Sequence, residues 1–285
     1  ITLAVGFWGC NDLSRTTYSG SDYVMFSDTL SMYPVQDSEK WFEIPVVATN
    51  ICDYDRSFGV EVDDKASNAI EKKQYVVESN TVTIKAGERV AKFRMKGVYE
   101  NIGKTDSLSV TFNLLAKDEN IWDLYGTRTR VQMQKACPFE LSTFEGYCLL
   151  TSSFFSAYMT NTEHRLLQAE RDKAEDNTII LHDFFYKNYD LKIKYDPSDP
   201  LKPFVEFDEQ IIGSTAEAFG TIYGNGKLMC DQPVAYDSYY NVCQKFVILY
   251  TTIYVVGKGT VGTYVNILEW ISDEEAEQYK KEEGL

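Results

Sequence analysis

The chain has 285 residues, a length that predicts two domains because a domain averages about 150 residues. Hydrophobic residues make up 44% of it, which suffices for folded cores and excludes a wholly disordered chain. Its 28 basic and 43 acidic residues give a net charge of −15, which argues against a general nucleic-acid binder. The aromatic share of 14% is typical both of β-rich chains and of ligand-contacting surfaces.

The start of the chain, Ile1 to Gly9, is apolar and uncharged, and Cys10 follows it directly. This run is too short to cross a bilayer core, which takes about 20 residues in a helix, but it matches the end of a signal-peptide hydrophobic region. Gly9-Cys10 resembles the lipobox of bacterial lipoproteins, in which the cysteine is cleaved free and acylated. The resemblance implies a lipid anchor at Cys10, a flexible tether up to residue 21, and a place in the cell envelope on the surface-exposed or periplasmic face of the outer membrane. The alternative is a buried first strand with an incidental cysteine.

Acidic charge is concentrated in the second half of the chain. Residues 19–135 have a net charge of −3, whereas residues 136–285 have a net charge of −12. The densest acidic run, residues 273–277, is typical of a solvent-exposed helix start, because Ser272 can cap the helix and acidic residues stabilise its positive end. We therefore expect a short C-terminal helix, with a docking role for this tail as the alternative.

Cysteines other than Cys10 are five in number, so at least one thiol is free or bonded to another molecule if the protein lies outside the cytoplasm. Cys230 and Cys243 flank a stretch of turn residues, as the two arms of a hairpin would, which suggests a disulfide between them. Cys137 with Cys148 is the second candidate pair, and buried reduced thiols are the alternative. No Cys-x-x-Cys motif occurs and there are two histidines, so we expect no metal site and no cofactor.

Residues 23–115 consist of short apolar stretches separated by turn residues. Apolar and polar residues alternate most clearly in four segments, residues 58–62, 82–84, 90–95 and 107–114. Residues 86–88 form a turn between the second and third of these segments. Strands at this spacing, without a helical pattern between them, predict an antiparallel β-sandwich.

A set of residues in this region has the order and spacing of a known family. The set comprises Asp55-Arg56-x-Phe58, Ala69, Gln74-Tyr75, Val82-x-Ile84 and Ala86-Gly87-Glu88. It resembles a Calx-beta domain, an immunoglobulin-like sandwich, and more closely the variant found at the N-terminus of uncharacterised Bacteroidetes lipoproteins. The resemblance extends over about residues 22–116, and we place the predicted domain at residues 22–135.

Calx-beta domains bind calcium through acidic residues clustered at one end, which makes four aspartates candidate ligands here: Asp53, Asp55, Asp63 and Asp64. The paired aspartates expected after the strand that ends at Met95 are replaced by Gly97-Val98-Tyr99. We therefore expect no calcium and interpret the four aspartates as turn residues.

The second predicted domain, residues 136–285, contains several strand-like segments separated by strong turns at residues 196–200 and 224–226. Residues 162–174 fit either a short helix or a β-hairpin, of which we favour the hairpin. The pattern resembles the lipocalin-like β-barrels that lie C-terminal in the same Bacteroidetes lipoproteins. It predicts an antiparallel β-barrel or sandwich followed by the C-terminal helix.

The sequence contains no catalytic motif that we can identify, so we expect no enzyme activity and name no catalytic residue. Gly257-Lys-Gly-Thr-Val-Gly262 matches the GxGxxG string of dinucleotide-binding proteins, but strand-like residues follow it, so we interpret it as a glycine-rich hairpin. A nucleophile elbow, a Walker loop and a His-Glu-x-x-His motif are all missing. A hydrolase that uses two carboxylates in the second domain stays open, because such a pair needs no sequence motif.

Aromatic residues give the strongest indication of a binding surface. Tyr236, Tyr239 and Tyr240 lie in a polar, loop-like stretch, where exposed rings suit the apolar faces of sugars, although packing on a sheet surface is the alternative. These observations favour a non-catalytic envelope lipoprotein that presents a surface to glycans or to partner outer-membrane proteins. A secreted glycan hydrolase and a purely structural spacer are the alternatives. The tryptophans in apolar surroundings, which we expect in the core, are Trp41, Trp122 and Trp270.

Overall fold

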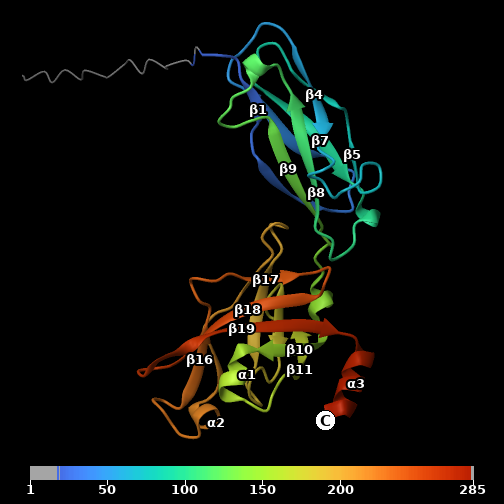
Figure 1. Ribbon diagram of the computed structural model, residues 1–285. Helices are drawn as coiled ribbons and strands as arrows, with labels where there is room; N and C mark the ends of the chain where they lie inside the picture. Colours follow the sequence, from blue (N-terminus) through green and yellow to red (C-terminus); the bar gives the residue numbers. More distant parts are fainter. Residues whose placement is uncertain (1–17, 19, 284–285) are drawn as a thin grey trace, which may run out of the picture. The chain divides into compact units, whose positions relative to one another are not determined.

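The computed structural model describes residue 18 and residues 20–283, which form two compact units built almost entirely of β-strands (Figure 1). The main boundary lies between Met133 and Gln134, and the short segments Pro34–Asp37 and Ile102–Asp106 group with the second unit. The all-β fold class predicted from the alternation is confirmed. Within the described residues, each helix is too short or too polar to cross a membrane. Cys10, the predicted lipidation site, lies outside these residues.

The first unit is a β-sandwich of two mainly antiparallel sheets, as the alternation predicted. Its elements are β1 (Val24–Phe26), β2 (Leu30–Val35), β3 (Phe42–Ala48), β4 (Arg56–Val62), β5 (Tyr75–Val77), β6 (Thr81–Ile84), β7 (Val90–Gly97), β8 (Leu108–Leu115), β9 (Arg128–Lys135), and the 3₁₀ turns η1 (Tyr99–Asn101) and η2 (Asp118–Asn120). One sheet has the order β1-β3-β7-β5 and the other β2-β9-β8-β4-β6. Ile44 and Phe93 from the first sheet and Val110 and Val131 from the second are fully or almost fully buried, because alternate residues of each strand point into the core.

Strands β6 and β7 lie in different sheets, although they follow one another in sequence with the predicted turn between them. Gly87 adopts a left-handed conformation (φ +81°), which favours glycine, and its N–H donates to the carbonyl of Cys52 at 2.8 Å. The carboxylate of Asp55 accepts the N–H of Ala86 at 2.9 Å. The turn residues were therefore identified correctly, but they join the two layers of the sandwich instead of two paired strands.

A buried ion pair connects several segments of the first unit. Arg56 in β4, whose side chain is 5% exposed, donates to both carboxylate oxygens of Asp22 at 2.8 and 2.9 Å. The guanidinium also donates to the carbonyl of Glu88 at 3.0 Å, and the Asn120 side chain donates to the carbonyl of Asp22 at 2.7 Å. Together these contacts hold the segment before β1, the η2 turn and the turn before β7 against β4.

We expect Arg56→Ala to lower the free energy of unfolding of the first unit by about 3 kcal/mol, because it removes the charged partner of a mostly buried carboxylate. Urea unfolding followed by tryptophan fluorescence measures the loss. Lys85→Ala is the matched control, because it breaks the ion pair with Asp55 in which the side chains are 64% and 48% exposed, and it should barely move the midpoint. Equal losses in the two variants would contradict a special role for Arg56.

The second unit is a closed antiparallel barrel. Its strands are β10 (Gly146–Ser152), β11 (Arg165–Arg171), β12 (Thr178–Leu181), β13 (Leu191–Asp196), β14 (Phe204–Glu206), β15 (Gln210–Ser214), β16 (Lys227–Asp231), β17 (Ser238–Asn241), β18 (Phe246–Val255) and β19 (Gly259–Ile271). Pairing runs through β10-β11-β12-β13-β14-β17-β18-β19, and β19 returns to β10. Strand β18 pairs with β17 through residues 246–248 and with β16 through residues 252–254. The β15–β16 hairpin therefore extends the wall beyond β14 and β17.

Side chains fill the interior of the barrel. Phe144, in the 3₁₀ turn η3 (Leu141–Phe144), lies with its ring centroid 4.6 Å from Tyr195, 5.1 Å from Trp270 and 5.7 Å from Tyr240. All four side chains are buried, which confirms the core position predicted for Trp270. Because this interior is packed with rings and aliphatic side chains, we look for a binding surface on the outside of the wall.

Trp41 and Trp122 are half-buried, so the core position predicted for them is wrong. The Trp41 ring lies beneath the ammonium group of Lys96, 5.5 Å from the ring centroid. Trp122 stacks on Tyr23 with the ring centroids 5.3 Å apart. Apolar neighbours in the sequence are found around indole rings on the surface as well as in the core. They therefore did not distinguish a half-buried tryptophan that packs on a surface side chain from a fully buried one.

Local elements of the second unit follow the sequence patterns closely. Residues 162–174 enter strand β11, which pairs with β12, so the hairpin interpretation is confirmed. The glycine-rich residues 257–262 form the β18–β19 turn and the first residues of β19, as predicted for a hairpin. Helix α3 (Asp273–Glu283) follows Ser272, whose hydroxyl and N–H both donate to the Glu275 carboxylate. The sequence did not reveal two helices of five or six residues, α1 (Ser153–Tyr158) and α2 (Thr215–Phe219).

Candidate functional site

The three tyrosines chosen from the sequence divide between the outside and the inside of the barrel. Tyr239 in β17 is 41% exposed and Tyr236 in the preceding loop is 53% exposed. Tyr240 is buried, because successive residues of a strand point to opposite faces, so its prediction as a ligand-contacting residue is wrong. Its hydroxyl donates to the carbonyl of Asp196 at 3.2 Å, and burial raises its pKa to about 12.

A row of apolar side chains crosses the outside of four neighbouring strands. The strand register places Phe204 of β14 opposite Tyr239 of β17, and Tyr239 opposite Ile248 of β18. Ile248 in turn lies opposite Ile267 of β19. Phe204 is 36% exposed and the two isoleucines are half-buried. Because opposite residues in adjacent strands lie about 5 Å apart, the row is continuous.

A second set of side chains widens this row. Tyr236 stacks on Tyr250 of β18, with the ring centroids 5.1 Å apart and the ring planes at 21°. Tyr250 lies opposite Val265 of β19, and the ring of Phe246 meets the ring of Tyr239 edge to face at 6.3 Å. We call the combined surface the aromatic face; it comprises Phe204, Tyr236, Tyr239, Phe246, Ile248, Tyr250, Val265 and Ile267.

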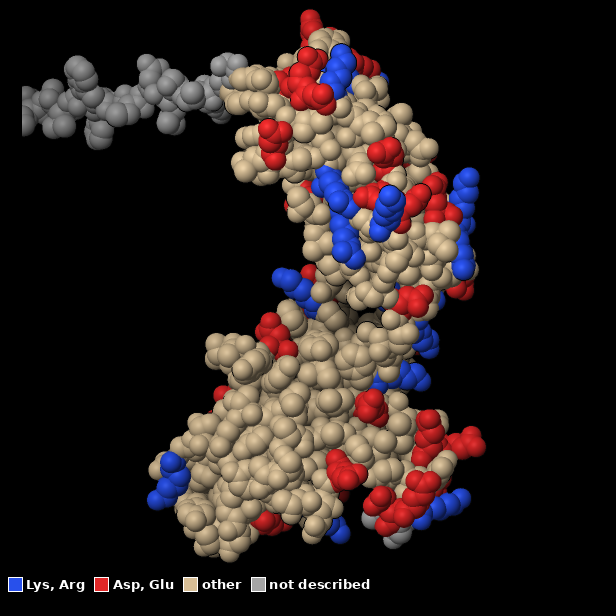
Figure 2. Space-filling model, viewed as in Figure 1, with Lys and Arg blue, Asp and Glu red and all other residues tan. Residues whose placement is uncertain are grey.

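The aromatic face contains no charged residue. Figure 2 shows that most of the second unit's visible surface over β18 and β19 is without charged side chains, although this half of the chain has a net charge of −12. Acidic residues outnumber basic ones at the rim. The rim carries Glu206 on β14, Asp237 beside Tyr236 and Glu269 opposite Phe246, together with Lys194 opposite Glu206 and Lys245 before Phe246. The turn from β17 to β18 adds the amide side chains of Asn241 and Gln244. An uncharged aromatic centre is therefore bordered by hydrogen-bonding groups.

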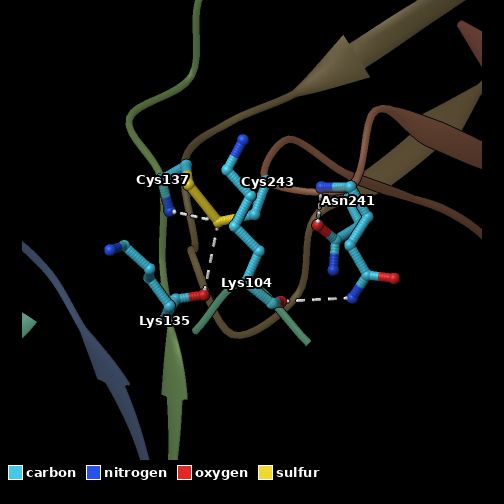
Figure 3. The surroundings of a disulfide bond; sticks show 6 residues. Lys104, Lys135, Cys137, Asn241 and Cys243 are labelled. Atoms are coloured by element: carbon cyan, nitrogen blue, oxygen red, sulfur yellow. Dashed lines mark hydrogen bonds between the residues drawn. A yellow bond between two sulfur atoms is a disulfide. The ribbon is translucent and has the colours of Figure 1, made fainter. Parts of the chain in front are cut away.

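A disulfide anchors the turn at one end of the aromatic face (Figure 3). Cys243, in the turn between β17 and β18, is bonded to Cys137, which precedes β10; the Cα atoms are 5.3 Å apart. Its sulfur also lies 3.5 Å from the carbonyl of Lys135. The turn that connects Tyr239 to Phe246 is thus held covalently to the start of the barrel.

The disulfide pairings suggested from the sequence, Cys230 with Cys243 and Cys137 with Cys148, are both wrong. Cys230 lies on β16, and β16 and β17 pair with the same edge of β18, so Cys230 and Cys243 are not on two arms of one hairpin. Cys148 and Cys230 are free and buried, as the reduced-thiol alternative allowed, and Cys52 is free and half-buried. Burial raises the pKa of the Cys148 thiol well above its usual value and that of Cys230 to about 12, so neither is a reactive nucleophile.

We expect the double variant Cys137→Ser/Cys243→Ser to lower the free energy of unfolding of the second unit by about 2–4 kcal/mol, because the bond closes a loop of more than 100 residues. Urea unfolding without reductant measures the difference. In the same assay, reductant should destabilise the unsubstituted chain and leave the double variant unchanged. Cys52→Ser is the control and should keep the original stability and its sensitivity to reductant.

A groove of about 480 Å³ next to the aromatic face, with Glu206 in the lining, brings several carboxylates together. Gln210 bridges the wall there: its side-chain oxygen accepts the N–H of Lys192 at 2.8 Å and its amide donates to the carbonyl of Lys192 at 2.9 Å. Lys192 also donates to the nearly buried carboxylate of Asp172, which lowers the pKa of that carboxyl. The lining carboxylates, which a two-carboxylate hydrolase would need, belong to Glu175, Glu206 and Asp208.

Two of the four aspartates considered as calcium ligands, Asp63 and Asp55, are engaged in turns and ion pairs. Asp63 accepts the N–H groups of Lys65 and Ala66 at 3.1 and 3.2 Å and forms an ion pair with Arg128, which confirms its role as a turn residue. Asp55 accepts from the Lys85 ammonium and the Ala86 N–H. Over residues 20–283, no three His, Cys, Asp or Glu side chains are grouped so as to hold a metal ion.

Phe204, Phe246 and Tyr250 belong to the aromatic face but were not identified from the sequence. The alternation in residues 246–255 contained a signal for two of them, because Phe246, Ile248 and Tyr250 share one parity. Their combination with Phe204 depends on the pairing of β14 with β17, which is separated from it in sequence by the β15–β16 hairpin. Local patterns do not report such a pairing.

Residues 124–282 match the family described as Domain of unknown function (DUF4984), and no curated protein matches the chain. Similar solved structures include the apo form of the Calx CBD1 domain, with 16% identity, 41% of this chain and 98% of that chain covered, and a TM-score of 0.33. A protein of unknown function from Bacteroides ovatus is 8% identical; the match covers 86% of this chain and 89% of that chain, with a TM-score of 0.36. An auxiliary nutrient binding protein from Bacteroides thetaiotaomicron is 10% identical; the match covers 86% of this chain and 91% of that chain, with a TM-score of 0.32.

Proposed function

The chain belongs to the family described as Domain of unknown function (DUF4984), and we propose that its barrel binds a neutral glycan on the aromatic face without catalysing a reaction. The observation that carries this proposal is the outward row from Phe204 to Ile267 with the stacked Tyr236–Tyr250 pair beside it. A solvated protein surface exposes scattered apolar side chains, whereas a continuous patch of them is typical of an interaction site.

Ring packing on the aromatic face suits a sugar. A pyranose presents a flat face of C–H groups that packs on an aromatic ring and removes apolar surface from water. Tyr236 and Tyr239 keep about half of their side chains exposed, while Tyr250 and Phe246 support them from within the face. Because this support and the nearby disulfide fix the rings in advance, binding costs little additional side-chain entropy.

Polar groups at the rim favour neutral over acidic sugars. Glu206, Asp237 and Glu269 offer carboxylates that accept hydrogen bonds from hydroxyl groups. The Gln244 amide donates to the carbonyl of Lys104, and the Asn241 side-chain oxygen accepts the Gln244 N–H, so these two amides hold the turn in place. The same carboxylates, in a half of the chain with a net charge of −12, repel uronic acids and sulfated sugars. The charge pattern therefore selects an uncharged polysaccharide.

A direct test uses soluble neutral polysaccharides (a β-glucan, a xylan and a mannan) together with the acidic polymer pectate, titrated into the full chain by calorimetry. We expect binding to at least one neutral polymer, none to pectate, and about tenfold weaker binding in Tyr236→Ala and Tyr239→Ala, because each change removes a stacking ring. Tyr54→Ala, at a tyrosine of the first unit that is 60% exposed, is the matched control and should bind normally.

Failure to bind any neutral polymer, or normal affinity in both tyrosine variants, would contradict the proposal and favour a structural spacer. Reducing ends that appear during the titration and disappear in Glu206→Gln or Asp208→Asn would favour the hydrolase instead, because these carboxylates line the 480 Å³ groove. The two alternatives thus give different results in one set of measurements.

We also propose that a lipid anchor at Cys10 holds this surface at the outer membrane of the cell envelope. The support is the apolar run before Gly9-Cys10 and the polar residues from Asn11 to Ser21, which suit a tether. Glycan capture and docking to a partner outer-membrane protein are both compatible with such an anchor.

In cells that express the chain behind a complete signal peptide, we expect Cys10 to be the acylated N-terminal residue of the membrane fraction, as measured by intact-mass spectrometry. After a high-salt wash that removes electrostatically bound protein, Cys10→Ser should be lost from that fraction, because the acylated cysteine supplies the anchor. Cys52→Ser should not. An uncleaved chain with an unmodified Cys10 would contradict the anchor without bearing on glycan binding.

A further inference from the structure

A second exposed apolar surface lies at the barrel end that contains α2 and the β18–β19 turn. Ile222 and Tyr223, in the loop after α2, are 75% and 48% exposed, and Val256, in the β18–β19 turn, is 49% exposed. Tyr158 at the end of α1 is 36% exposed. We call these four residues the apolar tip. Val256 follows Tyr250 by six residues along β18, which is roughly 20 Å at the rise of a β-strand, so the tip is separate from the aromatic face.

The apolar tip is built from contacts that hold its turns together. A Cβ atom at Gly224 would lie 2.8 Å from the carbonyl oxygen of Val256, so only a glycine allows the loop to approach the β18–β19 turn this closely. The N–H of Tyr223 donates to the hydroxyl of the buried Thr215 at 3.0 Å. Ile222 is therefore exposed on a loop in which the following residues, Tyr223 and Gly224, are held by Thr215 and by the β18–β19 turn.

Aromatic contacts continue this support toward α1. The ring of Phe219 meets Tyr158 edge to face at 5.4 Å and Tyr223 at 5.9 Å. Because these rings face one another, they offer little free flat surface for stacking on a sugar. The most exposed members of the tip, Ile222 and Val256, are aliphatic and have no aromatic face at all.

Charge at the apolar tip has the opposite sign to the charge of the chain. Residues 218–227 and 255–263 contain two lysines, Lys227 and Lys258, and no acidic residue, in a protein with a net charge of −15. The carboxylate nearest in sequence, that of Glu217, accepts from the N–H and hydroxyl of Ser214, which lies opposite Lys227, so two lysines stand against one carboxylate here. Figure 2 shows basic side-chain atoms at the end of the β18–β19 hairpin.

From this combination we infer that the apolar tip binds the surface of an anionic lipid bilayer. Aliphatic and tyrosine side chains enter the region between headgroups and acyl chains, and lysines beside them pair with anionic headgroups. An acidic protein partner would satisfy the lysines, but it would not require the protruding Ile222. The inference rests neither on glycan binding nor on an anchor at Cys10.

The test is co-sedimentation of the full chain, carrying Cys10→Ser to prevent acylation, with vesicles of phosphatidylcholine alone or mixed equally with phosphatidylglycerol. We expect binding to the mixed vesicles, weakened at least tenfold by Ile222→Ser/Tyr223→Ser and by Lys227→Glu/Lys258→Glu, since each lysine contributes about fivefold. Raising the salt concentration should weaken binding further, because ions screen exposed charges.

Matched controls separate the tip from general effects. Leu124→Ser changes an apolar side chain of the first unit that is 73% exposed. Lys202→Glu/Lys245→Glu makes the same change in net charge near the start of β18, at the end of that strand opposite Val256. Both should bind vesicles as the parent chain does, and the apolar residues 1–9 are common to all variants. Equal binding by tip and control variants, equal binding to neutral vesicles, or no binding by the parent chain would each overturn the inference. Calorimetry with the neutral polysaccharides stays unaffected by the tip variants in every case.

Discussion

The alternation of side chains in a closed antiparallel wall is the constraint on which the second unit depends. Each strand of the barrel has one inward and one outward face, and bulky side chains such as Phe144, Tyr195 and Trp270 occupy the inside. Because the inside is a packed core, only the outward-pointing residues of each strand can contact a ligand. Tyr239 and Tyr240 demonstrate this division, because one step along β17 separates a surface ring from a core ring.

Two breaks in the barrel wall, between β14 and β15 and between β16 and β17, place side chains that a regular barrel would not have at these positions. Strands β16 and β17 pair with successive parts of the same edge of β18, and β14 and β15 pair with β17 and β16 in turn. Where one strand ends and the next begins, backbone N–H and C=O groups lose their strand partners, and side chains must satisfy them. Gln210 does so by replacing a backbone pair at Lys192. The break before β17 contains the loop that carries Tyr236 onto Tyr250. Departures from a regular barrel therefore create both the groove and part of the aromatic face.

How far the sequence predicts this protein depends on the range of the interaction concerned. Strands, turns and the capped α3 helix were predictable, because alternation and caps are local patterns, and they were confirmed from residues 58–62 through to Ser272. The pairing of Cys137 with Cys243 was not, because it depends on the closure of the barrel, in which β19 pairs with both β10 and β18 and so brings the segment before β10 near the β17–β18 turn. Tyr240 was misassigned for a simpler reason: the start of β17 fixes the parity, and a loop-like composition concealed it.

Net charge and local charge act on different ligands in this molecule. A net charge of −15 makes copies of the chain repel one another, which opposes association through the exposed rings. The aromatic face and the apolar tip contain no acidic residue, so the charges that border each surface determine which ligands it favours. Under the two proposals, neutral rings bordered by carboxylates would exclude acidic sugars, whereas aliphatic side chains bordered by Lys227 and Lys258 would attract anionic headgroups. Strand β18 and the turn that follows it contribute to both surfaces, so a single rigid element sets their separation. A ligand bound at one surface would then be held at a fixed distance from the other, which no flexible connection between two sites could ensure.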